Sequence, residues 1–235
     1  MPNQTMDLQQ LAVYLQRDAR DLHKLASRGH LPGRKVAGEW RFVVAEINHW
    51  ISTKLPEYDE DELTALESSG AAPAPTDEPV ISPLLAEACI AVPLEARTKN
   101  SVLRELVQLA EQSWQVYDAD AILTAITQRE EMGTTAMPNG VAIPHIHRPM
   151  PSAVGETVLA YGRTLSGIPF GADLGELTDI YFLLLSHDNR THLRVLARLG
   201  RLLLQPGFGD KLRGAETPAD TWQVIDAAER ELPAA

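Results

Sequence analysis

The sequence predicts two parts: a small, mostly helical N-terminal domain and a larger α/β domain whose mixed sheet is flanked by helices. Hydrophobic positions recur at helical spacing in short segments before residue 54, whereas strand-sized apolar runs alternate with longer amphipathic stretches after residue 81. An acidic segment rich in proline, alanine and serine lies between them. The predicted boundaries are therefore 6–54 for the first domain, 55–80 for a linker and 81–231 for the second domain.

Short helices and one hairpin account for the N-terminal domain. Leu8, Leu11 and Leu15 recur at helical spacing. Gly29 ends the second predicted helix, and Gly38 lies at the turn of the predicted hairpin. The spacing predicts helices over 8–15, 19–27 and 44–51 and a hairpin over 35–42.

The second domain combines helical and strand patterns. Asp118 is a helix N-cap and Gly133 follows the same helix, while Thr217-Pro218 opens the last one. The patterns predict helices over 102–110, 119–131 and 191–204 and strands over 141–143, 157–161 and 180–185. The last of these strands is continuously apolar, as expected for a strand that is buried on both faces.

Composition favours a cytoplasmic protein that does not span a membrane. No apolar run reaches the roughly 18 residues that a membrane helix needs, and the first residues lack the basic and apolar regions of a secretion signal. Cys89 is the only cysteine, which excludes an internal disulfide, and we expect it to be a small buried residue.

The net charge of −11 is unevenly distributed. Residues 1–54 carry eight Lys/Arg and five Asp/Glu, a balance of +3, whereas residues 55–80 carry eight acids and no base. The N-terminal domain is thus the only part with a basic balance, and we expect the acidic linker to stay solvated and mobile.

The most informative stretch runs from Arg129 to His145, where a helix ends, a glycine-bearing loop follows and a short strand delivers a histidine. Neutral imidazole is a nucleophile near pH 7 and can form a phosphoramidate with a phosphoryl group. Phosphoryl transfer needs positive charge and hydrogen-bond donors around the oxygens. Arg129, the hydroxyls of Thr134 and Thr135, and His192 at a helix N-terminus are candidates for these roles.

Simpler interpretations of the same residues exist. His145 could be a core histidine, Arg129 could cap the carbonyls of its own helix, and His192 could be an ordinary residue at a helix start. Four imidazoles could also hold zinc, although no cysteine cluster or carboxylate motif accompanies them, so no metal and no cofactor are expected. These four are His145, His147, His187 and His192.

The run Arg-Glu-x-x-Gly-Thr-Thr-x-x-x-Asn-Gly-Val-Ala-Ile-Pro-His resembles the signature of IIA domains of the fructose–mannitol type in the bacterial phosphotransferase system, including their nitrogen-regulatory branch. The resemblance implies that His145 accepts a phosphoryl group from the phosphocarrier HPr, with Arg129 and His192 as further active-site residues. It spans about 81–231 and includes the block Gly167–Asp173. One departure is Ile146, where many members have glycine.

The N-terminal part resembles the excisionase/MerR-like winged helix-turn-helix, through its first two helices, Arg28-Gly29-His30-Leu31-Pro32 and Trp40-Arg41-Phe42. In that family the second helix enters the major groove and the wing contacts phosphates. The resemblance implies DNA contacts by basic residues, namely Arg17, Arg20, Lys24, Arg28, Lys35 and Arg41. A solvated basic face, or a domain used only for protein contacts, is the alternative.

The combined interpretation is a phosphohistidine-bearing regulatory protein, a phosphotransfer component rather than a turnover enzyme, whose modification is coupled to DNA binding. The expected partners are an HPr-type donor, DNA, and a IIB domain or a regulatory target; the sequence leaves a homodimer open. Two alternatives remain: a carrier that passes the phosphoryl group to a IIB domain during sugar uptake, and a binding module with a silent site.

Overall fold

The computed structural model describes residues 4–68, 80–172 and 175–233. Its N-terminal domain packs two helices and a three-stranded antiparallel sheet of order β1-β3-β2, and ends in a third helix. The elements are β1 (Thr5–Met6), α1 (Leu8–Leu15), α2 (Ala19–Ser27), β2 (Arg34–Val36), β3 (Glu39–Val43) and α3 (Val44–Lys54). The predicted helices and hairpin are all present, with α3 extending three residues further than expected.

Side-chain caps fix where the N-terminal helices begin. Asp7 accepts a hydrogen bond from the backbone of Gln10, and the Gln10 side chain accepts one from the backbone of Asp7, which forms a capping box at α1. Asp18 caps α2 in the same way through the backbone of Arg20. The chain therefore turns sharply between α1 and α2, as a helix-turn-helix requires.

The linker prediction is wrong for residues 55–68. They form η1 (Leu55–Glu57) and α4 (Glu60–Ser68), and α4 packs along α7 with Leu63 and Glu67 buried. The acidic run lies at the first turn of α4, where negative charge is favourable. The serine- and proline-rich stretch that was expected to complete the linker, 69–76, lies outside the described residues.

A buried ion-pair network holds α4 against α7. The Glu67 carboxylate accepts from Arg198 Nε at 2.6 Å and from Arg201 Nη1 at 2.8 Å, and Arg201 Nε also pairs with Glu60 at 2.7 Å. Glu229 lies 3.7 Å from Arg198 and accepts from the backbone of residues 80–82. Opposite charges can be buried when they are paired in this way, and these pairs anchor α4 to the second domain. Leu66 of α4 also joins the hydrophobic cluster of the N-terminal domain.

The second domain has a five-stranded mixed sheet of order β4-β7-β8-β6-β5. β4 pairs with β7 and β6 pairs with β8 in parallel, whereas β7 pairs with β8 and β5 with β6 in antiparallel register. The strands are β4 (Ile90–Ala91), β5 (Ala136–Met137), β6 (Val141–Ala142), β7 (Val158–Pro169) and β8 (Leu177–Leu185). The expected burial of 180–185 on both faces is confirmed.

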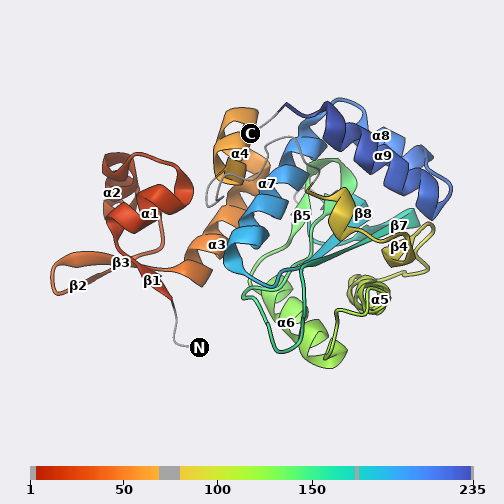
Figure 1. The fold of residues 1–235 in the computed structure, drawn as a ribbon, viewed down its shortest axis with the longest axis horizontal. Helices are drawn as coiled ribbons and strands as arrows, with labels where there is room; N and C mark the ends of the chain where they lie inside the picture. Colours follow the sequence, from red (N-terminus) through yellow and green to blue (C-terminus); the bar gives the residue numbers. More distant parts are fainter. Residues whose placement is uncertain (1–3, 69–79, 173–174, 234–235) are drawn as a thin grey trace.

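Helices cover both faces of this sheet (Figure 1). α5 and α6 lie on one side, and α7, α8 and α9 lie on the other. The helices are α5 (Lys99–Glu111), α6 (Ala119–Glu131), α7 (Asn189–Leu204), α8 (Phe208–Gly214) and α9 (Pro218–Glu231), with short turns η2 (Ser82–Leu84), η3 (Glu87–Cys89) and η4 (Pro138–Gly140). This is the predicted α/β arrangement. Among the described residues no helix is both long and apolar enough to cross a membrane.

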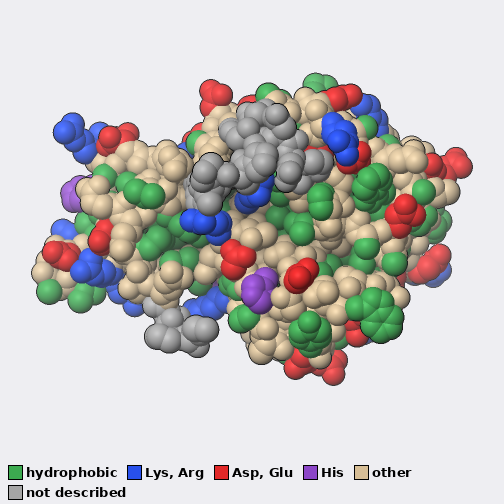
Figure 2. All heavy atoms as spheres, in the orientation of Figure 1, with side chains coloured by type: hydrophobic (Ala, Val, Ile, Leu, Met, Phe, Trp, Pro, Cys, Tyr) green, Lys and Arg blue, Asp and Glu red, His purple; other side chains and the backbone are tan. Residues whose placement is uncertain are grey.

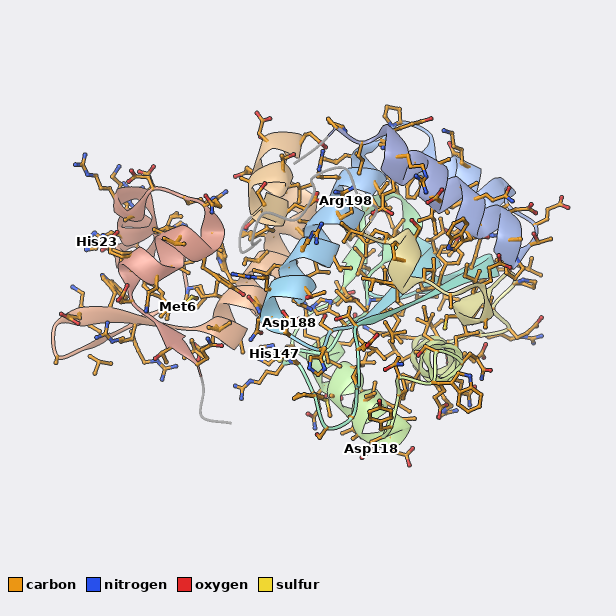
Figure 3. The ribbon with its side chains drawn as sticks, viewed as in Figure 1. Met6, His23, Asp118, His147, Asp188 and Arg198 are labelled. Carbon is orange, nitrogen blue, oxygen red and sulfur yellow. The ribbon has the colours of Figure 1, made fainter. Side chains whose placement is uncertain are left out.

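The N-terminal domain is docked on the start of α7 through α3 (Figure 1). Leu193 and Ala197 of α7 share one hydrophobic cluster with Ile47 and Ile51 of α3. Figure 3 shows His147 and Asp188 at this junction and His23 at the outer end of the N-terminal domain. The two parts therefore meet beside the segment that carries the candidate histidines.

Candidate functional site

Sheet topology brings two of the candidate histidines together. β6 and β8 run in parallel, so their carboxyl ends lie at the same edge of the sheet, and His145 bridges to Leu184 just beyond β6. β8 is followed by α7, whose N-cap is Asp188 and which carries His192 in its first turn. The ring centroids of His145 and His192 are 5.2 Å apart. The sequence prediction that these residues meet agrees with this geometry.

A glycine is required where the chain turns into β6. Gly140 has a φ of +77°, and a Cβ there would meet Arg213 Nη2 and Asp179 Oδ1 at 2.9 Å. A side chain would be strained by the backbone and blocked by this ion pair. The turn fixes the direction in which β6 delivers His145.

The His145 ring is held in one tautomer. Its Nδ1 lies 2.8 Å from the carbonyl oxygen of Ile143 and donates to it, because a carbonyl can only accept. Nε2 consequently carries the lone pair, and it accepts from Arg129 Nε at 3.1 Å. The lone pair of Nε2 therefore faces the guanidinium group.

Arg129 connects three parts of the site from the last turn of α6. Besides the bond to His145, its Nη1 donates to the Gly133 carbonyl at 2.9 Å and its Nη2 donates to Ser52 Oγ at 2.9 Å. Gly133 lies beyond Met132, the C-cap of α6, so this bond is to the following loop and not to the helix carbonyls weighed as an alternative. The bond to His145 is compatible with the predicted active-site role, which remains a prediction. One guanidinium makes both.

His192 is oriented by Ser186, whose Oγ lies 2.9 Å from His192 Nδ1. A hydroxyl donated to Nδ1 leaves the proton on Nε2, which is the form that donates to an anion. His192 lies in the first turn of α7, where backbone N–H groups also favour negative charge.

The two threonines line the site but their hydroxyls are engaged elsewhere. Thr134 Oγ1 donates to the Phe170 carbonyl at 3.2 Å, and Thr135 Oγ1 donates to Glu130 at 2.7 Å. Glu130 also pairs with Lys99 at 3.0 Å. The described contacts thus make Thr134 and Thr135 supports of the loop, and their predicted role in binding phosphate remains a prediction.

The N-terminal domain contributes residues to this site that sequence reasoning missed. Ser52 and Thr53 of α3 and Leu55 of η1 line a cavity of about 400 Å³ together with Thr134 and His145. His49 of α3 lies edge-on to His147, with ring centroids 5.5 Å apart. Since 77 residues separate Ser52 from Arg129, no local sequence signal could have found this contact.

Burial keeps the histidines neutral. It lowers the pKa of His145 well below its ordinary value of 6.5, and the positive charge of Arg129 lowers that pKa further. Burial, then Arg129, lowers the pKa of His192 to about 4, and the same causes lower the pKa of His49 to about 4. The lowered pKa of His145 favours the neutral imidazole, which is the form that a phosphoryl acceptor needs.

The depressed pKa of His192 predicts that acid destabilises the fold. Between pH 6.5 and pH 4 the unfolded chain binds a proton at this residue and the folded chain does not, so stability falls as pH is lowered. The expected contribution is about 3 kcal/mol over that window. Urea unfolding of the native chain, His192→Asn and the exposed-site control His187→Asn should show a shallower pH dependence for His192→Asn alone. Identical pH dependence in all three would contradict this assignment.

The structure does not bring the four histidines weighed as zinc ligands together in one place. Within the described ranges, no group of three or more His, Cys, Asp or Glu is arranged to hold a metal ion. His187 is exposed and its ring contacts the Val154 carbonyl, 3.1 Å away. His147 is half-buried beside His49.

Four of the six predicted DNA-contacting residues are exposed on the N-terminal domain. Arg20, Lys24, Arg28 and Lys35 are exposed there, although Lys24 pairs with Asp21, and the Lys35 ammonium lies over the Trp40 ring. Arg41 is half-buried and pairs with Glu39. Figure 2 shows basic side chains at this end with acidic ones among them.

Arg17 is placed differently from the other five. Its guanidinium pairs with Glu62 of α4 and lies 5.6 Å from the centroid of the Tyr58 ring. Arg17 thus helps to dock the N-terminal domain, and this position does not favour its predicted contact with DNA.

Fold and site together define a class of protein: a helix-turn-helix domain joined to an α/β domain whose sheet edge carries a His–Arg–His site. Comparison with known families agrees. The family described as phosphoenolpyruvate-dependent sugar phosphotransferase system, EIIA 2, matches residues 83–228, and a helix-turn-helix domain family matches residues 5–54. The chain belongs to the EIIA 2 family and carries an N-terminal helix-turn-helix domain.

Individual relatives match over the second domain. A nitrogen regulatory protein of Bradyrhizobium diazoefficiens is 32% identical over 148 residues, which is 62% of this chain and 94% of that protein. The fructose-specific EIIABC component of Bacillus subtilis is 28% identical over 148 residues, but these are only 23% of its length. The crystal structure of nitrogen regulatory protein IIA-Ntr from Neisseria meningitidis shares the fold, with a TM-score of 0.56 at 23% identity, covering 61% of this chain and 97% of that one.

Proposed function

We propose that this chain is a cytoplasmic regulator that accepts a phosphoryl group on Nε2 of His145 from an HPr-type phosphocarrier. The observation that carries the proposal is the fixed, neutral His145 ring, whose Nε2 lone pair faces Arg129 in a domain of the EIIA 2 family. The presence of a helix-turn-helix domain favours DNA as the target of the regulation.

The chemistry needs no cofactor. The Nε2 lone pair attacks the phosphorus of the donor's phosphohistidine, a new N–P bond forms, and the N–P bond to the donor breaks with its electron pair returning to the donor nitrogen. Arg129 gives up its hydrogen bond to the Nε2 lone pair and binds the phosphoryl oxygens instead, while His192 donates a hydrogen bond to these oxygens from its own Nε2. The proton of His145 stays on Nδ1 and is donated to the Ile143 carbonyl, which stabilises the positive charge that develops on the ring.

Intact mass spectrometry after incubation with phosphoenolpyruvate, enzyme I and HPr tests the acceptor. The expected result is one acid-labile phosphate on the native chain and on the surface control His187→Ala, and none on His145→Ala. A phosphate on all three chains would place the chemistry at another residue, and no phosphate on any would favour a silent binding module.

Transfer onward to a IIB domain is the second candidate. It is favoured by the Bacillus subtilis relative, a fructose-specific EIIABC component whose name joins A, B and C components. Mixing the phosphorylated chain with a purified IIB domain distinguishes the two, since a carrier loses its phosphate within the mixing time and a dedicated regulator retains it.

DNA binding through the outer face of the N-terminal domain predicts a salt dependence. Each phosphate neutralised contributes about −0.9 to the log–log slope of affinity against salt. Replacing Lys24 and Arg28 by alanine should therefore reduce the slope on a mixed-sequence duplex by about two. Exposed cations of the second domain, Arg97 and Lys211, provide the matched double-alanine control. Equal slopes for the two double variants would exclude the assigned face.

A further inference from the structure

Helix α3 of the N-terminal domain lies directly over the phosphorylation site. Ser52 Oγ accepts from Arg129 Nη2 at 2.9 Å, and His49 packs edge-on against His147. One turn earlier on α3, Asn48 Nδ2 donates to Asn189 Oδ1 at 2.9 Å at the start of α7. The contacts follow one face of α3 along the edge of the sheet where His145 and His192 lie.

This arrangement closes the site. His145 is 3% exposed and Arg129 is 1% exposed, and the open space beside them is walled on one side by Ser52, Leu55 and Pro56. Phosphoryl transfer requires the donor's phosphorus to approach Nε2 to roughly 3 Å in line with the leaving nitrogen. A donor protein cannot bring its phosphohistidine there while α3 and η1 remain in place.

We propose that docking of the helix-turn-helix domain and phosphorylation of His145 exclude each other, so that the phosphoryl group releases α3 from the site. This inference rests on the proposed function of His145 and adds its regulation. In the docked state, the chain's own segment α3–η1 covers the surface through which the site would exchange phosphoryl groups.

Arg129 is the group for which the two states compete. In the docked state its Nη2 donates to the neutral hydroxyl of Ser52. A phosphoryl group on His145 brings about −1.5 to −2 charges next to the same guanidinium. Arginine binds such oxygens through charge-assisted, often bidentate bonds that are stronger than a bond to a hydroxyl. The phosphoryl group therefore takes Arg129 away from Ser52 and fills the space beneath α3.

The contacts allow α3 to leave the site while α4 stays packed on α7. Glu67 ties α4 to Arg198 and Arg201 by buried ion pairs, so we place the pivot at η1, before α4. Release then also separates Arg17 from Glu62, and Leu66 from the hydrophobic cluster of the N-terminal domain.

Polar contacts at Asn48, His49 and Ser52 lie beside the apolar contact of Ile47 and Ile51 with α7. The buried Nδ1 atoms of His49 and His147 have no hydrogen-bond partner within the described residues. Such unsatisfied groups weaken an interface, which makes docking reversible.

Linkage makes the effect reciprocal. If phosphorylation disfavours docking, then any ligand that favours the undocked N-terminal domain speeds phosphorylation by the corresponding shift in population. Removing one docking bond to the charged Arg129 should have the same effect, because it raises the undocked fraction by about tenfold.

The first test is the rate of phosphoryl transfer from phosphorylated HPr to the full chain. Ser52→Ala should be phosphorylated about tenfold faster than the native chain. Ser68→Ala is the matched control, because Ser68 is an exposed helical serine that bonds its own helix, to the Thr64 carbonyl; it should react at the native rate. An unchanged or slower rate for Ser52→Ala would overturn the proposal, and a slower one would make Ser52 part of the phosphate site.

The second test measures the domain separation in the same phosphorylated sample. Spin labels on the exposed positions of Ser27→Cys in α2 and Glu111→Cys in α5 report the distance, since the native Cys89 is fully buried. A single narrow distribution that becomes broader and longer with one phosphate per chain by mass supports the release. An unchanged distribution with one phosphate per chain overturns this inference alone, whereas no phosphate by mass overturns the proposed function and the inference with it.

Discussion

Replacing Arg129 by glutamine is expected to slow phosphoryl transfer to His145 by about 100-fold or more. Arg129 is the cation that faces His145 Nε2, and burial of the pair strengthens its interaction with charge that develops on the phosphoryl oxygens. Glutamine can donate a hydrogen bond but brings no charge. Lysine should restore the rate only in part, because it lacks the planar fork that contacts His145, Gly133 and Ser52 together.

Rapid-quench measurement of transfer from phosphorylated HPr gives this rate directly. Arg104→Gln, at an exposed position on α5, is the matched control and should keep the native rate. Loss of Arg129 also removes the docking bond to Ser52, which alone would speed the reaction, so a net slowing shows that the charge dominates. A native rate for Arg129→Gln would show that this guanidinium takes no part in the transfer.

Replacing Glu67 by alanine is expected to lower the free energy of unfolding by about 3–5 kcal/mol. Glu67 is 2% exposed and neutralises Arg198 and Arg201, which stay buried when it is removed. Arg198 is then left with Glu229 at 3.7 Å and Arg201 with the half-exposed Glu60. The buried positive charge is under-compensated, and it cannot regain its hydration without opening the contact between α4 and α7. The loss therefore reflects the partners left behind more than the strength of the original pair.

Urea unfolding of Glu67→Ala and Glu60→Ala measures this effect with a control on the same arginine. Glu60 also pairs with Arg201, but its side chain is 44% exposed, so its removal should cost less than about 1 kcal/mol. Equal losses for the two variants would mean that α4 is not anchored through Glu67 and could move with the N-terminal domain.

Local sequence patterns were sufficient for the parts of the fold that depend on local structure. The caps at Asp118 and Thr217, the apolar run Ile180–Leu185 and the loop from Arg129 to His145 are read from neighbouring residues, and each lies where it was expected. His192 was placed beside His145 because the motif order implied it, and the parallel pairing of β6 and β8 accounts for the meeting.

Long-range contacts explain what the sequence did not predict. Glu67 appears in an acidic stretch that resembles a solvated linker, yet its partners Arg198 and Arg201 lie 131 and 134 residues away. Ser52 likewise shows no sign of its bond to Arg129. The strand expected over 157–161 is observed as Val158–Pro169. The sequence pattern missed its second half because the pairing with β8 shifts register between Arg163 and Ile168, which interrupts the alternation of hydrophobic residues.

The central claim is that Nε2 of His145 is the atom that accepts the phosphoryl group. Nuclear magnetic resonance of the chain phosphorylated by HPr, with nitrogen-15 in its histidine rings, tests this directly through the coupling between phosphorus and nitrogen. Because Nδ1 is committed to the Ile143 carbonyl, the coupling should appear at Nε2 of His145 and be absent in His145→Ala. Coupling at Nδ1, or at the ring of another histidine, would contradict the account.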